Sequence, residues 1–551
     1  MNIVVQLLYN FYKEEIFSTI VLVSICVLLN VVQTNGISSI TANIINSLKD
    51  KNQANINYLF ILFVTLSLLY LVLHYFFKLY QNKIMTKLRQ WIRNELVRLL
   101  ILSNNENFSD QNFIKLNSPI NRMSSVCFMI SSDIMTFILP TLIFLLVIMF
   151  YFLYTNFFLG LFFLLSNIAV MFYVYMTWNE TLEKNDQYEK QCAESEFYLL
   201  EILNNIDKII YRGQSKQEIS TFDDMSKKTI IKAFNFYQKT NNNSVIMNLS
   251  VHLILFILVF YNLKLFYEKK LSIISFITLF SIFIMYRDKM ATFIQQIPDF
   301  VEFIGRTNSV LDHFDIIDIK HENLNKQYNE VELPFESITF ENVSFKYKKG
   351  DRKIFDKFNY TLYTNENKII GICGVSGRGK SSFAKLFLKM YDDYEGNIYI
   401  DNKNIREIDA DYIRQHITYV NQNSKLFDKK IIENMLYGCN HSETCYSKVS
   451  EIMNNYEKIK ELFKDMDIHT KKTGPLGEHL SGGQRQMVNM IGGLINPSEI
   501  LVLDEPTNAL DINLKKDLLK LIKEFKKFKK CIIIITHDKD VYELFDEKIE
   551  M

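Results

Sequence analysis

The sequence predicts an all-α transmembrane domain of six helices followed by an α/β domain. Its 551 residues are too many for one ordinary domain, since a domain averages ~150 residues. Long apolar runs with few charges recur from about 16 to 283, whereas charges, glycines and short strand-like runs dominate from about 338 onward. We therefore expect a transmembrane domain over residues 1–330, a linker over 331–337 and an α/β domain over 338–551.

Charge and cysteine content narrow the classes of partner. The formal net charge is +1, which gives no reason to expect a nucleic acid partner. The seven cysteines are scattered without a C-x-x-C pair, so we expect reduced, buried thiols and neither a disulfide framework nor a zinc site. They are Cys26, Cys127, Cys192, Cys373, Cys439, Cys445 and Cys531.

Six segments approach or meet the ~20 apolar residues that a spanning helix needs. They cover residues 16–40, 56–77, 132–154, 157–178, 245–267 and 272–292. The first exceeds the apolar region of a signal peptide, and no small-residue cleavage site follows it, so we expect a retained helix. The sequence thus predicts an integral, multi-pass protein of the lipid bilayer, with the plasma or cell membrane as its expected location.

Basic residues predict the orientation of these helices. The long connections after the second and fourth segments are rich in Lys and Arg, whereas the opposite loops hold few such residues. The positive-inside bias places both connections, the amino terminus and the α/β domain in the cytosol. Helical periodicity over 83–101 and 195–228 predicts that the second to fifth helices continue past the bilayer as rods. The polar turns at 107–118 and 211–221 either touch the α/β domain or are solvated loops.

Charges also lie near the ends of two predicted spans. Arg287, Asp288 and Lys289 interrupt the last apolar stretch, where they either line a polar passage or lie in the inner headgroup layer. We favour the headgroup layer, because about 16 residues at 1.5 Å each separate them from the start of that stretch. Asp133 is interpreted as interfacial in the same way.

The α/β domain opens with a half-buried strand, marked by Ile338, Phe340, Val343 and Phe345. A buried strand at 368–373 then leads into a glycine-rich loop and a helix at 382–390, the arrangement of a P-loop NTPase. We expect Lys380 to reach the β- and γ-phosphates of ATP and the Ser381 hydroxyl to bind Mg²⁺. The predicted phosphate-binding residues are Gly374, Ser376, Gly377, Arg378, Gly379, Lys380, Ser381 and Ser382.

Two further buried strands end in candidate catalytic groups. The strand at 500–503 leads to Asp504, placed to hold the Mg²⁺ hydration shell, and to Glu505, the candidate general base for water. The strand at 531–535 leads to His537, whose imidazole would hydrogen-bond the γ-phosphate and the catalytic carboxylate. Ligands sit at the carboxyl ends of parallel strands, so we expect these groups to gather at one edge.

The pentapeptide Leu480–Gln484 lies between the glycine-rich loop and the acidic pair. With this motif order the chain resembles a half-size ABC transporter of the exporter type, a membrane domain fused to an ABC-type ATPase domain. The resemblance implies that Tyr347 stacks on adenine. It also implies that Gln422 takes the place of the glutamine that senses the γ-phosphate and the membrane domain, and that it is a metal ligand together with Ser381 and Asp504. It also implies that Asp511 belongs to the loop crossing to the opposite site. The signature residues Ser481, Gly482, Gly483 and Gln484 would contact the γ-phosphate held by a second subunit.

The resemblance further implies ATP-driven export of an unidentified passenger by alternating access, with ATP and Mg²⁺ bound between two nucleotide-binding domains. A homodimer is favoured over a heterodimer, because one chain contains both halves of a competent site. The alternative is a subunit of a heterodimer with a regulatory or importing role. The two polar turns match the family's coupling helices.

The chain departs from the family pattern in three places. Met487 replaces an arginine, and Gly492 with Gly493 falls in the helix behind the signature, where each glycine costs ~1 kcal/mol relative to alanine. We expect that helix to be weakened or repacked. Gly474-Pro475 stands where a Gly-Glu pair is usual, with a glutamate only at Glu478, and the carboxyl-terminal subdomain is short. No departure touches Lys380, Asp504, Glu505 or His537, so we expect hydrolysis to be retained.

Overall fold

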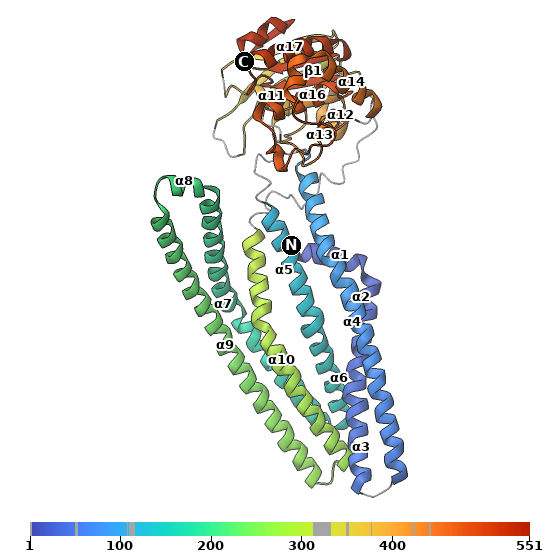
Figure 1. Ribbon diagram of the computed structural model, residues 1–551. Helices are drawn as coiled ribbons and strands as arrows, with labels where there is room; N and C mark the ends of the chain where they lie inside the picture. Colours follow the sequence, from blue (N-terminus) through green and yellow to red (C-terminus); the bar gives the residue numbers. More distant parts are fainter. Residues whose placement is uncertain are drawn as a thin grey trace. The chain divides into compact units, whose positions relative to one another are not determined.

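The computed structural model describes residues 3–49, 53–106, 108, 116–311, 332–348, 352–375, 377–422, 425–439 and 442–551. It divides into two compact units, of which the first comprises Met1–Leu99 and Gln111–Ile316 and the second Leu100–Asp110 and Ile317–Met551. The first unit is helical and the second is α/β, as predicted (Figure 1). The assignment of Leu100–Asp110 to the second unit was not predicted. The predicted boundary at 330 lies outside the described residues.

The helices of the first unit follow one another with short breaks. They are α1 (Ile3–Glu14), α2 (Ile16–Val31), the π-helical turn η1 (Val32–Ile37), α3 (Ser38–Lys49), α4 (Gln53–Ser103), α5 (Asn117–Asp133), the π-helical turn η3 (Ile134–Ile138), α6 (Leu139–Thr155), α7 (Phe157–Asn204), α8 (Ile206–Tyr211), α9 (Ser215–Tyr267) and α10 (Ile273–Leu311). The tight turn between α6 and α7 forms because Asn156 caps α7, its side chain accepting from the backbone N–H of Leu159 at 3.1 Å.

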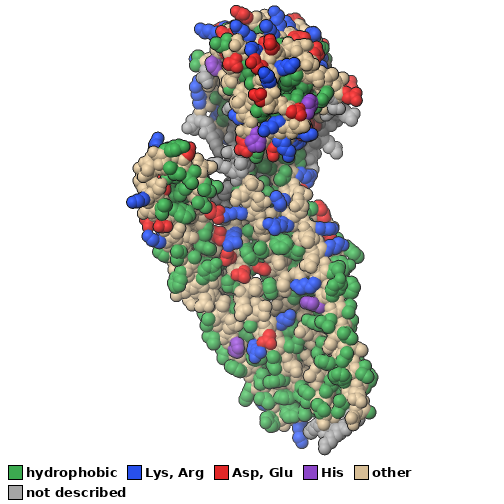
Figure 2. All heavy atoms as spheres, viewed as in Figure 1, with side chains coloured by type: hydrophobic (Ala, Val, Ile, Leu, Met, Phe, Trp, Pro, Cys, Tyr) green, Lys and Arg blue, Asp and Glu red, His purple; other side chains and the backbone are tan. Residues whose placement is uncertain are grey.

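Five helical stretches in the described part of the chain are long and apolar enough to cross a membrane. They are Ile16–Leu48, Gln53–Ser103, Asn117–Thr155, Phe157–Asn204 and Ser215–Tyr267. The sixth predicted span, 272–292, lies within α10, where Arg287, Asp288 and Lys289 interrupt the apolar run, and it stays a prediction. Exposed hydrophobic side chains gather over these helices, and charged side chains gather over the second unit (Figure 2).

The predicted rods are present. Helix α4 has 51 residues, α7 has 48 and α9 has 53, so each is longer than the ~30 Å core of a bilayer requires. The turn predicted at 211–221 is shorter than expected, because α9 already begins at Ser215. Helix α8 precedes it, and none of its side chains is buried. Of the turn predicted at 107–118, residues 107 and 109–115 lie outside the described residues.

Aromatic side chains fill the core shared by α6, α7, α9 and α10. Phe152 contacts Phe163 and Phe283 edge to face, and the buried Tyr286 donates to Asn167 at 3.0 Å. On the same stretch of α10, Arg287 bonds its exposed neighbour Asp288 at 2.8 Å. That pair therefore faces outward rather than into the core.

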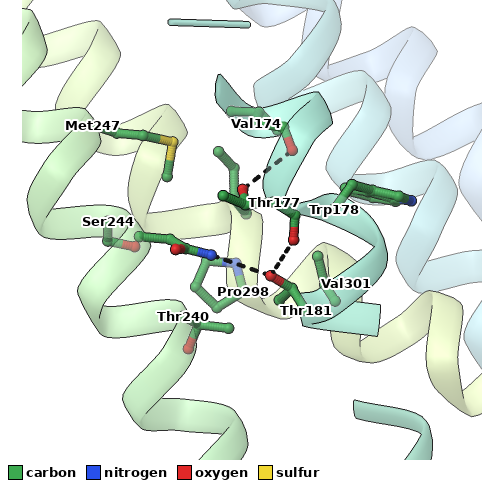
Figure 3. Close-up of a pocket in the computed structure, with 11 residues that line it drawn as sticks. Val174, Thr177, Trp178, Thr181, Thr240, Ser244, Met247, Pro298 and Val301 are labelled. Atoms are coloured by element: carbon green, nitrogen blue, oxygen red, sulfur yellow. Dashed lines mark hydrogen bonds between the residues drawn. The ribbon is translucent and has the colours of Figure 1, made fainter. Parts of the chain in front are cut away.

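A small cavity lies beside Pro298, the proline inside α10. It measures about 20 Å³, room for roughly one water molecule, and is lined by α7, α9 and α10 (Figure 3). Asn243 of α9 donates to Thr181 of α7 at 3.1 Å, and Thr181 donates to the carbonyl of Thr177 at 2.7 Å. Hydrogen-bonded polar side chains of α7 and α9 thus line the cavity together with apolar ones, beside the point where the proline interrupts the backbone ladder of α10.

Two sheets form the second unit. The parallel sheet has the order β6-β7-β8-β3-β9, and the antiparallel sheet has the order β2-β1-β4-β5. The strands are β1 (Ser337–Phe345), β2 (Phe355–Tyr363), β3 (Lys368–Cys373), β4 (Glu395–Ile400), β5 (Lys403–Asn404), β6 (Ile417–Val420), β7 (Ile500–Asp504), β8 (Cys531–Ile535) and β9 (Glu547–Glu550).

The α-helices of this unit pack around the sheets. They are α11 (Lys380–Phe387), α12 (Ala410–His416), α13 (Ile431–Met435), α14 (Ser442–Asn455), α15 (Glu457–Leu462), α16 (Gly482–Ile495) and α17 (Ile512–Phe525). Strands β7 and β8 are buried at every residue, because helices cover both faces of a parallel sheet. Their continuous apolar runs end at the predicted catalytic groups, so the fold brings those groups to one edge of the sheet.

One cysteine prediction is wrong. Cys439 and Cys445 form a disulfide, with Cα atoms 6.7 Å apart. Cys439 follows α13 and Cys445 lies in the first turns of α14, so a chain reversal brings the two together at a spacing that a C-x-x-C search does not cover. The other five are free, and all but the half-buried Cys192 are buried, as expected.

Candidate functional site

The glycine-rich loop joins β3 to α11 at the edge of the parallel sheet. Gly377 and Gly379 have φ angles of 81° and 94°, a region that L side chains rarely adopt. These turns let the loop fold back over the amino end of α11, where backbone N–H groups are free to bind an anion. Lys380 bends over the loop and donates to the carbonyls of Gly374 at 2.9 Å and Val375 at 3.3 Å. Ser376 lies outside the described residues.

The two serine hydroxyls that follow Lys380 lie in different environments. Ser381 is half-buried, while Ser382 is buried and shares a 2.6 Å hydrogen bond with the Tyr347 hydroxyl. The ring of Tyr347 contacts Phe345 and Tyr391 edge to face. The predicted adenine-stacking aromatic therefore lies beside the phosphate loop, half-buried and anchored through its hydroxyl.

Asp504 ends β7 with its side chain buried and held by a tyrosine. The Tyr419 hydroxyl donates to Asp504 Oδ2 at 2.6 Å. Tyr419 pairs with Val502 in the parallel β6–β7 register, so Asp504 lies two residues further along on the same face. Burial and the adjacent Asp504 carboxylate raise the pKa of Tyr419, which keeps its hydroxyl protonated. No sequence motif predicts Tyr419.

Glu505 follows directly and contacts the predicted histidine. Its carboxylate lies 2.7 Å from His537 Nδ1 and accepts from Thr536 Oγ1 at 3.2 Å. Its backbone φ is 50°, a costly conformation for a non-glycine residue that is found at functional sites, and its N–H donates to Ile535 at 2.8 Å. Glu505 is buried while the His537 side chain is 63% exposed, so the histidine is open to an incoming group.

The signature forms the amino end of α16. Ser481 and Gln484 make a reciprocal capping box, in which Ser481 Oγ accepts from the Gln484 N–H at 3.2 Å and Gln484 Oε1 accepts from the Ser481 N–H at 2.8 Å. Ser481 and Gly482 are exposed, and a Cβ on Gly483 would lie 3.2 Å from the carbonyl oxygen of Ala509. The helix therefore presents an uncovered, positively polarised end.

Other predicted residues lie in loops near these elements. Gln422 lies in an exposed turn that follows β6. Asp511 caps α17, accepting from the N–H groups of Asn513 and Leu514 at 2.9 and 3.0 Å. Arg378 is exposed in the glycine-rich loop. Gln486, which was not predicted, donates to the carbonyls of Glu505 and Pro506 at 3.1 and 2.7 Å, and so ties the signature helix to the catalytic loop.

The departures from the family pattern have packing explanations. Helix α16 is continuous through Gly492 and Gly493, and the repacking named as one of the two expectations is seen there. A Cβ on Gly493 would lie 2.3 Å from Val420 Cγ2, and one on Gly492 would lie 3.0 Å from the carbonyl oxygen of Met435. Met487 is fully buried in the core around α16. The glycines thus let α13 and β6 approach α16 closely.

The loop before the signature turns tightly. Gly474 has a φ of 74°, and a Cβ there would lie 2.7 Å from the His479 ring. His479 donates its backbone N–H to Thr473 at 3.0 Å, which closes the turn. Glu478 is exposed on it. The departure at Gly474-Pro475 therefore builds a compact turn that places its single carboxylate at the surface.

The segment that follows α4 packs on the α/β fold within the second unit. Arg414 donates to the backbone carbonyl and side chain of Asn105, and also to the carbonyls of Leu388 at 3.1 Å and Lys389 at 2.8 Å. Lys389 pairs with Glu106 at 2.9 Å, and both side chains are buried. The Phe108 N–H donates to Met390 at 2.7 Å. A predicted coupling turn thus begins with a buried, charged contact that has no sequence motif.

These residues fit ATP and Mg²⁺. The positive-φ glycines and the amino end of α11 form an anion cradle, and Gly377 has open space where a Cβ would be. A buried carboxylate on Asp504 and a hydroxyl on Ser381 are oxygen donors of the kind that Mg²⁺ prefers.

Comparisons with known proteins agree with the helical unit and the nucleotide-binding unit described above. Residues 16–288 match the family described as ABC transporter transmembrane region, and residues 358–508 match the family described as ABC transporter. A solved bacterial Atm1-family ABC exporter with ATP bound shares the fold with a TM-score of 0.77 at 18% identity, over 98% of this chain and 93% of that one.

Curated relatives match over part of their length. The ATP-dependent lipid A-core flippase of Photorhabdus laumondii is 32% identical over 42% of this chain, and the mating factor M secretion protein mam1 of Schizosaccharomyces pombe is 34% identical over 36%. The lactococcin-G-processing and transport ATP-binding protein LagD of Lactococcus lactis is 32% identical over 43%. The matches span 39%, 14% and 33% of those proteins, respectively. With both family regions matched in order, the chain belongs to the ABC transporter family, with a transmembrane region fused to an ATP-binding domain.

Proposed function

We propose that the protein is an ATP-driven exporter, in which ATP hydrolysis drives the transmembrane helices between inward- and outward-facing states. The observation that carries this proposal is the Glu505–His537 contact at 2.7 Å, at the same sheet edge as the phosphate loop and Asp504. A regulatory relative without hydrolysis would not need a carboxylate held in this strained, hydrogen-bonded position.

Each residue has a role that its geometry supports. Lys380 and the backbone N–H groups of the loop hold the phosphates, and Glu505 takes a proton from the attacking water. His537, open to solvent and bonded to Glu505, orients that carboxylate and contacts the γ-phosphate. Ser381 and Asp504 would hold Mg²⁺, and the bound ion would supply positive charge to offset the charge that develops on the phosphate oxygens.

The proposed site is completed by a second copy of the chain. Ser481 and Gly482 are exposed at the amino end of α16, whose positive end suits the γ-phosphate of an opposing subunit. Gln422 and Asp511 belong, on the same proposal, to the loops that sense ATP and cross between the sites. A homodimer is the simplest assembly, because one chain supplies both a phosphate loop and a signature.

Two regions of this chain suit transmission of the ATP state to the membrane helices. Asn105 and Glu106 directly follow α4 and are held by Arg414 and Lys389. Helix α8 exposes apolar side chains, with Ile206, Ile210 and Tyr211 at 50%, 62% and 84% exposure. Exposed apolar surface at a helix tip favours contact with another protein surface, here proposed to be a second copy. We place both regions and the ATP sites in the cytosol, from the positive-inside bias.

A paired measurement tests this function. The purified chain in lipid vesicles should hydrolyse ATP, and Glu505→Gln should lower the rate about a hundredfold or more while ATP still binds. Glu478→Gln, an exposed carboxylate before the signature, is the control and should retain the wild-type rate. Equal rates for wild type and Glu505→Gln would refute the role of Glu505. A further measurement on the wild-type protein addresses the passenger. Stimulation of its ATP hydrolysis by a lipid or by a peptide would distinguish these two classes of passenger, which resemble those named for the relatives.

A further inference from the structure

Tyr419 holds the buried Asp504 carboxylate through a hydrogen bond that the functions assigned so far do not use. It lies in β6, three residues before Gln422, and reaches across to the end of β7. The Tyr419 hydroxyl donates to Asp504 Oδ2 at 2.6 Å, and Asp504 is 5% exposed. A buried carboxylate oxygen with no donor would be costly, so this bond selects one orientation of the side chain.

The orientation matters because the other oxygen remains for a different partner. With Oδ2 occupied by the phenol, Oδ1 is the oxygen of Asp504 left for another partner. Asp504 ends β7 at the same edge of the sheet at which β3 leads into the glycine-rich loop and then to Ser381, in the first turn of α11. Hydrogen bonds of this kind fix the geometry of groups that bind a metal ion or its water shell. The structure holds no second hydroxyl donor to Asp504 among the contacts of its described residues.

Two other tyrosines belong to the same region. Tyr347 and Tyr391 both contribute, after burial and Asp504, to the raised pKa of Tyr419, and the Tyr391 ring packs against that of Tyr347. Tyr347 in turn bonds Ser382, next to the proposed metal-binding Ser381. A cluster of tyrosines thus backs the phosphate loop and ends in the bond to Asp504.

We propose that Tyr419 is a positioning residue for Mg²⁺: by bonding Oδ2 it presents the other carboxylate oxygen of Asp504 to the hydrated metal ion. The inference rests on the proposed ATP site and adds a residue that determines how tightly that site holds Mg²⁺. Tyr419 acts through Asp504 and does not touch ATP.

The test separates metal binding from nucleotide binding and from folding. In full-length Tyr419→Phe, binding of a fluorescent ATP analogue in EDTA should equal that of the wild type. Mn²⁺ binding to the same nucleotide complex, followed by electron paramagnetic resonance, should weaken about tenfold. Tyr456→Phe is the matched control, since Tyr456 also bonds a carboxylate, that of Glu524, away from the site. It should leave both quantities unchanged.

A double-mutant comparison distinguishes positioning from general destabilisation. In the Asp504→Asn background, Tyr419→Phe should cause no further loss of Mn²⁺ affinity, because its partner carboxylate is already gone. Unchanged Mn²⁺ affinity in Tyr419→Phe would overturn the proposal. Loss of nucleotide binding in EDTA would also overturn it, because the tyrosine would then support the loop itself. Failure of the proposed function would appear separately, as wild-type protein that does not bind ATP.

Discussion

At the scale of single residues, buried charges carry much of the organisation of the α/β unit. Glu505, Asp504 and Lys380 are buried and hydrogen-bonded at the sheet edge, whereas Lys529 is buried behind it. Lys529 Nζ donates to the carbonyl oxygen of Ser498 at 2.8 Å and to that of Asn496, the residue that caps the carboxyl end of α16. A cation suits that end of a helix, but its burial is costly.

Lys529 predicts a pH dependence of stability. Burial lowers its pKa from 10.5 to about 7 in the folded state. Between these values the unfolded chain holds more protons than the folded chain, so stability should rise with pH across that window. The unfolding temperature of the wild type, relative to that of Lys529→Met, should therefore be higher at pH 9 than at pH 7. If this difference in unfolding temperature did not change with pH, the lowered pKa of Lys529 would be contradicted.

At the scale of elements, the strands and the phosphate loop were predictable and the packing between them was not. Buried runs at 368–373, 500–503 and 531–535 predicted β3, β7 and β8, because continuous apolar strands are typical of parallel sheets. Tyr419 and Arg414 escaped prediction because their partners lie on other elements and no spacing in sequence reports such a contact. The disulfide escaped for a different reason, because its two cysteines are six residues apart, a spacing that a C-x-x-C search does not cover.

The roles of the two glycines of α16, Gly492 and Gly493, could not be predicted from the sequence. The sequence predicts that glycines destabilise a helix, but it does not report that a neighbouring element approaches closely at each of them. Gly493→Ala should cost about 1–3 kcal/mol of unfolding free energy, because its Cβ would overlap Val420. Thermal unfolding and ATP hydrolysis measure the effect.

A second substitution, Val420→Ala, should restore part of the stability that Gly493→Ala loses. Val420→Ala removes the methyl group that the new Cβ would meet, so Gly493→Ala should cost less in the Val420→Ala background than in the wild type. Equal costs in both backgrounds would show that the close approach at Gly493 is unimportant.

At the scale of the whole molecule, the proposed function requires the state of the ATP site to be transmitted to helices that are longer than the bilayer needs. The last residues of α4, 100–103, belong to the α/β unit together with the segment that follows them. The contacts of Asn105 with Arg414 and of Glu106 with Lys389 are buried and charged, and removing one partner of such a contact is costly.

Arg414→Met should loosen this contact. Loss of hydrogen bonds from a charged donor costs about 1.5–3 kcal/mol, so amide hydrogen exchange in peptides covering 100–106 should accelerate. Exchange over 482–495, in the signature helix, should not change. Arg406→Met is the control, because Arg406 likewise bonds backbone carbonyls, those of Tyr394 and Gly396, at another place in the same unit. Unaltered exchange over 100–106 would show that Arg414 does not hold the segment.

The central proposal is a composite ATP site, with the phosphate loop of one copy facing the signature of another. It is tested most directly by ATP hydrolysis in mixed dimers isolated through two different tags. A Lys380→Met chain paired with a Ser481→Arg chain retains one intact composite site and should hydrolyse ATP, although each variant alone does not. A wild-type chain paired with a chain carrying both substitutions has no intact composite site and should be inactive. Activity in the second pairing and none in the first would show that each chain completes its own site, and would contradict the proposal.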